Sequence, residues 1–309
     1  MLLQLEGAGI FGLVQGGVFA LAALGIVLVY RVTGVLNFAH GAMGMFSTFV
    51  AWHVLIVWHP LAKTGDQAAG DWPSVILAVV SALLFSLALG FVLENAVFRW
   101  LRGRPQLVKA VITIGVLLVL QAGAALLFGT TQYHQAIRFP GARNTFVSFG
   151  PFIRLSLEYI IAVAAALVLA ASLAAFLRFS RFGIAMRAVS DDPVAASLWG
   201  VPVNRVGSIS WMLGSFVAAI AGILITPFIN FDTVSLTVLI VDALAAALIG
   251  GLVSLPLTLL GGFLLGLLEA FPKIWIQSPG FPKVIAIVVI LAVLLMRSER
   301  GLLRSSNDE

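Results

Sequence analysis

Long apolar stretches recur along the whole chain and are separated by shorter polar connections. Nine of them approach the length of about 20 residues that a helix needs to cross a bilayer. They are residues 8–30, 38–58, 74–98, 107–128, 156–178, 207–228, 233–252, 256–272 and 283–297. The stretches are apolar around their whole circumference, which is typical of lipid-facing helices and of helices inside a bundle. The pattern therefore predicts membrane-spanning helices.

The junction between the first two apolar stretches is polar and rich in glycine. Residues 33–41 read TGVLNFAHG. Backbone of this kind at membrane depth is tolerated only where it is buried in protein or lines a cavity. One interpretation is a broken helix in which Asn37 and His40 shape a translocation path or its gate. The other is an ordinary turn in which Asn37 and His40 satisfy the backbone of the loop.

Two connections are long, residues 129–155 and 179–206. In the second, Ser190 or Asp191 is placed to cap a helix that has a proline in its first turn. Gly200 is placed to end it. The sequence therefore predicts a short helix of about two turns in this connection.

One side of this predicted helix, from Asp191 to Val201, is apolar. The side is formed by Val194, Ala195, Leu198 and Trp199. A groove on a soluble partner would supply the packing that so short a helix lacks. The alternative is a helix that lies on the membrane surface with Trp199 among the headgroups.

The composition excludes a water-soluble protein. Of the 309 residues, 61% are hydrophobic and 10% are charged, and the mean hydropathy is +1.10. Soluble domains are roughly 45–50% apolar and about 25% charged. Disordered and nucleic-acid-binding proteins are excluded on the same ground. The predicted fold is an all-α polytopic membrane protein with about eight or nine transmembrane helices and with broken or re-entrant segments.

Lysine and arginine are distributed unevenly between alternating connections. Twelve of the 18 lie at residue 31, in 99–109, in 178–205 and in 297–304. The other six lie at residue 63, in 138–154, and at residues 273 and 283. Basic connections of membrane proteins stay in the cytoplasm. We therefore expect 99–109, 178–206 and the C-terminus to be cytoplasmic, and 129–155 to lie outside.

A few polar side chains fall inside the apolar stretches, where they usually face a cavity or another helix. Asp242 and Glu269 are each suited to neutralise a substrate ammonium or to accept hydrogen bonds from a neighbouring helix. The position of Glu269 at the end of its stretch favours the structural role. Thr113 and Gln121 lie about two turns apart on one helix face. They either line a polar path or bond to neighbouring helices.

Motifs for chemistry on this chain are absent from the sequence. No P-loop, Gly-x-Ser-x-Gly or His-Glu-x-x-His motif occurs, and there are no cysteines. His40 has no second ligand three or four residues away, which argues against a metal site. An intramembrane enzyme that uses His40 with Asp242 lacks a nucleophile and an oxyanion device. If transport is driven by ATP, the nucleotide must bind to a partner chain.

Six segments carry a resemblance to a known family. In chain order they are GVFALAALGIVLVYRVTGVL at 17–36, NFAHG at 37–41, FVLENAVFRWLRGRP at 91–105, ITIGVLLVLQ at 112–121, FGIAMRAVSDDPVAASLWGV at 182–201 and IGGLVSLPLTLLGGFLLGLLEA at 249–270. Together they resemble the permease subunits of bacterial branched-chain amino acid ABC importers, of the LivH type. The resemblance covers nearly the whole chain.

The resemblance implies a function and a set of partners. It implies the permease subunit of an ATP-driven importer for branched-chain or related small amino acids, without enzymatic activity or a cofactor of its own. The implied partners are a second permease subunit, homologous or identical, two cytoplasmic ATP-binding subunits and an extracytoplasmic solute-binding protein. The implied location is the bacterial plasma (inner) membrane, in contact with lipid and without nucleic acid.

The resemblance and the residue patterns together give the expected organisation and sites. Residues 1–309 are expected to form a single transmembrane permease domain, with a coupling segment at about 179–206 and an outer loop at about 129–155. The expected substrate path comprises Asn37, Phe38, His40, Gly41, Thr113, Gln121 and Asp242. The expected ATPase-coupling residues are Arg187, Asp191, Asp192, Ala195, Ala196, Leu198, Trp199 and Gly200.

Two departures from the family pattern leave the substrate open. Asp242 stands near a position where the family commonly has a lysine, and residues 250–254 read GGLVS where the family has Gly-Gly-x-Gly-Ser. Branched-chain amino acids, urea, other small amides and other amino acids therefore remain as substrates. The rival function is an ion-coupled secondary transporter of a small polar solute, with Asp242 and Glu269 as coupling carboxylates.

Overall fold

The computed structural model describes most of the chain. The described residues are 2–58, 71–101, 103–130, 133–134, 137, 139–142, 145–149, 153–276, 278 and 280–305. Lys63 and several positions of the expected outer loop 129–155 lie outside the described residues.

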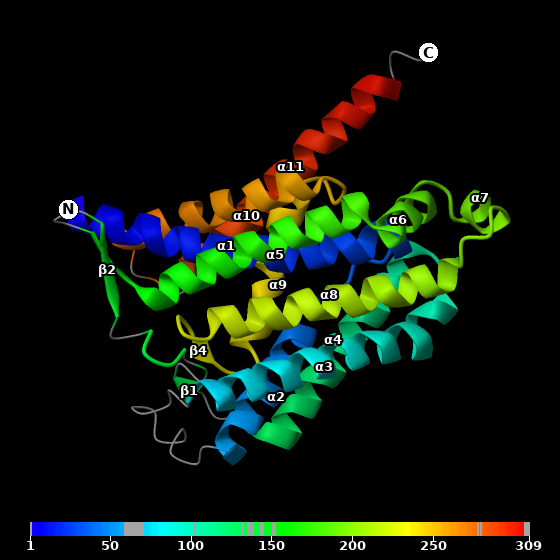
Figure 1. Cartoon of the computed structure of the whole chain (residues 1–309). Coiled ribbons are helices and arrows are strands. Elements are labelled where there is room, and N and C mark those ends of the chain that lie inside the picture. Colours follow the sequence, from blue (N-terminus) through cyan, green and yellow to red (C-terminus); the bar gives the residue numbers. More distant parts are fainter. Residues whose placement is uncertain are drawn as a thin grey trace.

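Helices dominate the part of the chain that the structure describes, and four short strands accompany them there (Figure 1). The first half of the chain contains α1 (Leu2–Thr33), α2 (His40–Trp58), α3 (Trp72–Ala96), the 3₁₀ helix η2 (Phe98–Leu101), α4 (Gln106–Phe128), β1 (Tyr133–His134), β2 (Phe146–Phe149) and β3 (Ile153–Ser156). The second half contains α5 (Leu157–Phe179), α6 (Arg181–Asp191), α7 (Pro193–Leu198), α8 (Val203–Ile225), β4 (Asn230–Phe231), α9 (Ser235–Ile249), α10 (Leu255–Ala270), η3 (Phe271–Ile274) and α11 (Phe281–Ser305).

Each of the nine predicted apolar stretches coincides with a helix, and the prediction of an all-α polytopic membrane protein is confirmed. In the described part of the chain, seven helices are long and apolar enough to cross a membrane. The other two apolar helices are α9 and the Phe281–Met296 part of α11. The 15 residues of α9 rise only about 22 Å, whereas the hydrocarbon core is about 30 Å thick. This short helix lies in the centre of the bundle (Figure 1).

The bundle is organised around α1 and α8. Both helices are mostly buried, whereas most residues of α3, α4 and α5 are at least partly exposed, as in lipid-facing helices. Close helix approaches hold the centre together. A Cβ at Gly16 of α1 would lie 2.8 Å from the Cα of Phe263 in α10. Small residues permit such contacts in membranes, where lipid supplies no hydrophobic drive for helix association.

The two ends of the bundle carry different connections (Figure 1). At one end, β1 pairs with β4 and β2 pairs with β3 in antiparallel ribbons. At the other end lie α6, α7 and the end of α3, where Phe98 of η2 stacks on Trp211 of α8 with ring centroids 4.1 Å apart. The connections 99–109 and 178–206 thus share one end, opposite the described part of 129–155. Which end faces the cytoplasm stays a prediction.

Candidate functional site

The α1–α2 junction turns back into the bundle. Gly34, with φ of 64°, ends α1, and its N–H donates to the Tyr30 carbonyl. The chain then runs without helix to His40. A Cβ at Gly25 would lie 2.8 Å from Nε2 of His40, so the imidazole packs against α1 at Gly25. Gly25 stands eight residues, or about 12 Å of helix, before the end of α1 at Thr33. A non-helical segment therefore separates α1 from α2, and the His40 side chain packs against the middle of α1.

Asn37 and Thr113 satisfy the backbone of this junction. The Asn37 Oδ1 accepts a hydrogen bond of 3.0 Å from the Ala39 N–H. The Phe38 N–H donates to Thr113 Oγ1 over 3.3 Å, and that hydroxyl lies 2.8 Å from the Ala110 carbonyl oxygen and 3.3 Å from the Leu36 carbonyl oxygen. Asn37 and Thr113 are buried. These contacts are what the ordinary-turn interpretation requires, and they also fix the shape of the break.

His40 and Gly41 close a narrow pocket between α2, α8 and α9. Its volume is only about 10 Å³, which is at the lower limit for holding one water molecule. Gly41 lies against α9, where a Cβ would fall 2.7 Å from the Thr237 carbonyl oxygen. The imidazole lies beside the backbone of Ala22, and within the described residues neither ring nitrogen makes a well-formed hydrogen bond. Among the described residues, the His40 pocket is therefore too small to pass a solute.

Gln121 lies apart from the junction. Its Nε2 donates to the Thr233 carbonyl over 3.1 Å, which ties α4 to the connection before α9. Thr113 likewise bonds to backbone rather than to a cavity. The bonding interpretation of these two residues is thus the one that the structure favours over a shared polar path.

A wide cavity of about 770 Å³ lies on the other side of α9. Its apolar wall is formed by Ile225, Phe228, Ile229, Val234, Val238, Leu239 and Ile276. Four charged residues, Asp242, Glu269, Lys273 and Lys283, also line it. We call this space the charged cavity. Phe228 and Ile229 immediately precede β4, so it extends toward the end of the bundle that carries the strands.

The four ionisable side chains of the cavity are two acidic and two basic residues, and Asp242 lies against both Lys283 and Glu269. Lys283 forms an ion pair with Asp242, whose side chain is fully buried while that of Lys283 is 35% exposed. Glu269 is also fully buried and lies beside Asp242. Lys273 donates to Gln15 Oε1 over 3.3 Å and lies over the Phe11 ring, 5.0 Å from its centroid. Two acidic and two basic residues therefore line the cavity next to an apolar wall, and the two acidic side chains are buried.

Sequence reasoning found Asp242 but missed its partners. Lys273 and Lys283 were expected only as basic residues of outer connections, and Glu269 was expected to have a structural role. A usable signal was present, because Glu269 and Lys273 stand four residues apart at a helix end, where such residues share a face. The pairing of Asp242 with Lys283 joins α9 to α11 and has no counterpart in local spacing.

Helix α9 contributes lining residues to both the charged cavity and the His40 pocket. Leu239 lines both spaces, while Asp242 faces the charged cavity and Ala243 faces the His40 pocket. Of the expected path residues, His40 and Gly41 line the His40 pocket and Asp242 lines the charged cavity. The remaining four, Asn37, Phe38, Thr113 and Gln121, line neither space. Among the described residues, no group of His, Asp and Glu is arranged to hold a metal ion.

The predicted helix in the 179–206 connection is present, but its expected bounds were wrong. Two helices occur, α6 and α7, joined at Asp192. Asp192 Oδ1 accepts from the N–H groups of Val194 and Ala195 over 2.8 and 3.0 Å, so Asp192 is the cap and Asp191 ends α6. Pro193 explains the break, because the residue before a proline is driven out of the helical region. Gly200, with φ of 81°, follows α7 as expected.

The two sides of α7 have different environments. Ala196 was expected among the ATPase-coupling residues. It is instead buried in the protein's own core, together with Leu28, Met186 and Val206. Val194, Leu198 and Trp199 are 69%, 83% and 89% exposed. Ala195 is half-buried, and Arg187 of α6 points to the Leu177 carbonyl. The exposed side of α7 is thus an apolar surface formed by Val194, Leu198 and Trp199, and its opposite side packs through Ala196 against the rest of the protein.

Comparisons with known proteins cover nearly the whole chain. The family described as branched-chain amino acid transport system / permease component matches residues 9–296. The chain is 29% identical to the high-affinity branched-chain amino acid transport system permease protein LivH of Escherichia coli (strain K12), over 92% of this chain and 91% of the relative.

Two further relatives have the same extent. The permease protein BraD of Pseudomonas aeruginosa is 29% identical over 93% of this chain and 92% of its own length. A probable branched-chain amino acid transport permease protein LivH of Methanocaldococcus jannaschii is 28% identical over 94% and 89%. No solved structure matches the chain. The chain therefore belongs to the family of permease components of branched-chain amino acid transport systems.

Proposed function

We propose that this chain forms the translocation path of an ATP-driven importer for aliphatic amino acids. The observation that carries the proposal is the charged cavity, which combines carboxylates, ammonium groups and an apolar wall. An aliphatic amino acid has a positive amino group, a negative carboxylate and an apolar side chain. Asp242 and Glu269 suit the first, Lys273 and Lys283 the second, and the wall the third.

The charges of the cavity favour a zwitterion over a neutral amide. Urea and acetamide carry no formal charge and would leave the buried Asp242 and Glu269 without compensation when they displace a lysine. A zwitterion replaces both members of an ion pair at once. The names of the relatives, which are branched-chain amino acid permeases, support the same substrate class.

The two spaces that α9 lines support a route through the permease. We propose that substrate delivered by a solute-binding protein enters the charged cavity from the end that carries the strands. Leu239 and the His40 pocket then form the closed inner barrier. Movement of α9 would join the two spaces. Residues 1–309 thus act as one permease unit, with 179–206 as the coupling segment and 129–155 as the outer loop.

The substrate proposal is tested by titrating the purified transporter, without its solute-binding protein, with leucine and two analogues. Isoamylamine lacks the carboxylate and isocaproate lacks the amino group. We expect leucine to bind at least tenfold more tightly than either, because each analogue leaves one pair of cavity charges uncompensated. Equal binding of all three, or tighter binding of acetamide, would contradict the recognition of a zwitterion.

Replacing both Asn37 and His40 with alanine is expected to impair uptake while the transporter still assembles. Asn37 shapes the junction, and the His40 ring fills the closed pocket, so their loss alters the barrier rather than the bundle. Uptake and subunit co-purification are measured in the same cells. His53→Ala is the matched control, since His53 lies on α2 but is exposed. Uptake at the wild-type rate in the double variant would return the junction to the ordinary-turn interpretation.

The proposed orientation is tested with single cysteines, since the chain contains none. Ser197 on α7 and Thr145 before β2 are both exposed and lie at opposite ends of the bundle. We expect Thr145→Cys to react with an impermeant thiol reagent in intact cells and Ser197→Cys to react only after permeabilisation. The reverse labelling would overturn the orientation inferred from the basic residues.

A further inference from the structure

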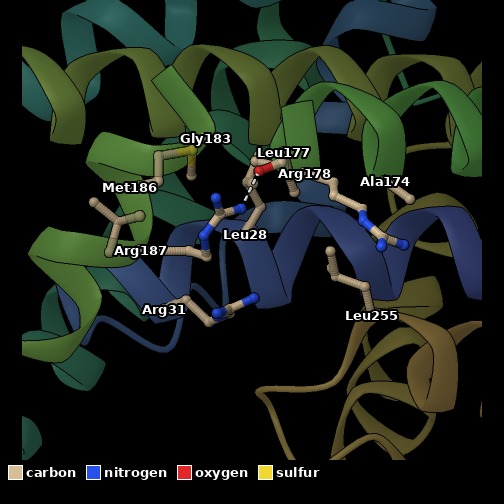
Figure 2. Close-up of a pocket in the computed structure, with 10 residues that line it drawn as sticks. Leu28, Arg31, Ala174, Leu177, Arg178, Gly183, Met186, Arg187 and Leu255 are labelled. Carbon is tan, nitrogen blue, oxygen red and sulfur yellow. Dashed lines mark hydrogen bonds between the residues drawn. The ribbon is translucent and has the colours of Figure 1, made fainter. Parts of the chain in front are cut away.

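A second pocket, separate from the charged cavity, lies at the end of the bundle that carries α6 and α7. It has a volume of about 140 Å³ and is built from α1, α5, α6 and the start of α10. Leu28, Val32, Met186 and Leu255 supply apolar lining, and Arg31, Arg178 and Arg187 supply positive charge. Figure 2 shows the guanidinium groups of Arg31 and Arg187 on one side of the pocket and that of Arg178 on the other, near Leu255.

The three arginines have no acidic neighbour in this pocket. No Asp or Glu is among the described residues that line it. Arg187 is held in place by donating to the Leu177 carbonyl, as the dashed line in Figure 2 marks. The Nε of Arg31 is buried without a hydrogen-bond partner in the described part of the chain. Three unneutralised cations around one space call for an anion, because like charges in close array repel.

The surface around the pocket is apolar on the side of α5. Phe179 is 77% exposed and lies under the guanidinium of Arg178, 5.5 Å from ring centroid to Cζ. Ile184 of α6 and Phe176 of α5 are exposed as well. Along α5 the exposed residues continue as aliphatic side chains, as on a lipid-facing helix. The pocket therefore lies at a boundary between a lipid-facing surface and a basic surface.

We propose that this pocket binds the phosphate headgroup of an anionic phospholipid. Arginine presents planar donors that match phosphate oxygens, and basic pockets between membrane helices are suited to such headgroups. The acyl chains would lie along the exposed apolar side of α5. Because the pocket joins α1, α5, α6 and α10, a bound lipid links the α6–α7 segment to the helix bundle.

The proposal is tested by native mass spectrometry of the full chain, purified with its associated subunits. The protein is titrated with phosphatidylglycerol, and in parallel with phosphatidylcholine, at equal detergent concentration. The double variant Arg31→Gln/Arg187→Gln is compared with Arg181→Gln/Arg205→Gln, which removes two exposed charges at the same end of the bundle, outside the pocket. Arg178→Gln, an exposed single variant, guards against misfolding of the double variant.

We expect wild type and the Arg181/Arg205 control to retain phosphatidylglycerol in preference to phosphatidylcholine. Each pocket arginine removed should weaken retention about fivefold, which corresponds to roughly 1 kcal/mol per basic residue near an anionic membrane surface. Equal retention by the pocket variants and the control would overturn the proposal. Displacement of the lipid by millimolar inorganic phosphate would assign the site to free phosphate instead. Loss of permease–permease association with unchanged lipid retention would assign it to a protein interface.

Discussion

Replacing Asp242 with asparagine is expected to weaken leucine binding and uptake about 10- to 100-fold, the range for the loss of a charge-assisted hydrogen bond. Asp242 is fully buried and pairs with Lys283 in the charged cavity. In the proposed function its carboxylate receives the substrate amino group, so the neutral amide removes the attraction while keeping the shape. Leucine titration of the purified transporter and initial uptake rates report the change. Glu6→Gln, an exposed carboxylate on α1, is the control.

A double-mutant cycle separates a role in binding from a structural role of the pair. If the pair only holds α9 to α11, Asp242→Asn/Lys283→Gln should be no worse than either single variant, because the two side chains then act as a unit. If each charge also meets the substrate, the double variant should bind leucine more weakly than both single variants. Unchanged binding in Asp242→Asn would exclude this carboxylate from the substrate site.

Replacing Leu198 or Trp199 with aspartate is expected to reduce substrate-stimulated ATP hydrolysis at least tenfold. Both side chains are almost fully exposed on α7, and burial of one large apolar side chain is worth about 1.5–3 kcal/mol. A charge placed there also opposes burial in a groove of an ATPase. Co-purification of the ATPases and ATP hydrolysis by the reconstituted complex are the measurements. Gln106→Glu, which adds a negative charge at an exposed position at the start of α4 and outside the coupling segment, is the control.

Ala196→Glu should behave differently from these two variants. Ala196 packs inside the permease, so a glutamate there should destabilise the permease itself and lower its amount in the membrane. Normal ATPase association in both Leu198→Asp and Trp199→Asp, with normal hydrolysis, would mean that the apolar surface of α7 lies on the lipid headgroups rather than on a partner.

The sequence contains enough information to predict the helices and the break between α1 and α2. Apolar length identifies each helix, and residues 33–41 stand out because polar, glycine-rich backbone is costly at membrane depth. The position of His40 within the bundle could not be predicted from the sequence. His40 lies opposite Gly25 because the chain folds back along α1, and this arrangement depends on packing against α8 and α9.

The charged cavity could be predicted only in part. Asp242 is conspicuous as a carboxylate in an apolar stretch, but its partner Lys283 belongs to a helix 41 residues further along the chain. Nothing in local spacing brings these two together. The sequence also predicts that Lys273 and Lys283 belong to connections, because each follows a proline at a helix end. Tertiary packing, rather than periodicity, creates the site.

The bounds of α7 show how one residue shifts an interpretation. Ser190, Asp191 and Asp192 are all good cap residues, and only Asp192 immediately precedes Pro193. The restriction that proline places on its predecessor decides for Asp192. In the helix that begins after Asp192, Ala196 faces the core, while Leu198 and Trp199 are exposed. A pattern of apolar residues on so short a helix does not distinguish its buried side from its exposed side.

Uptake of radiolabelled leucine into proteoliposomes tests the central claim most directly. The purified transporter is reconstituted with its solute-binding protein outside, and either ATP inside or an imposed proton or sodium gradient without ATP. We expect accumulation that requires ATP, persists with ionophores and is lost in Asp242→Asn. Accumulation driven by the ion gradient without any ATPase, and abolished by ionophores, would contradict the account and identify an ion-coupled transporter that uses Asp242 and Glu269.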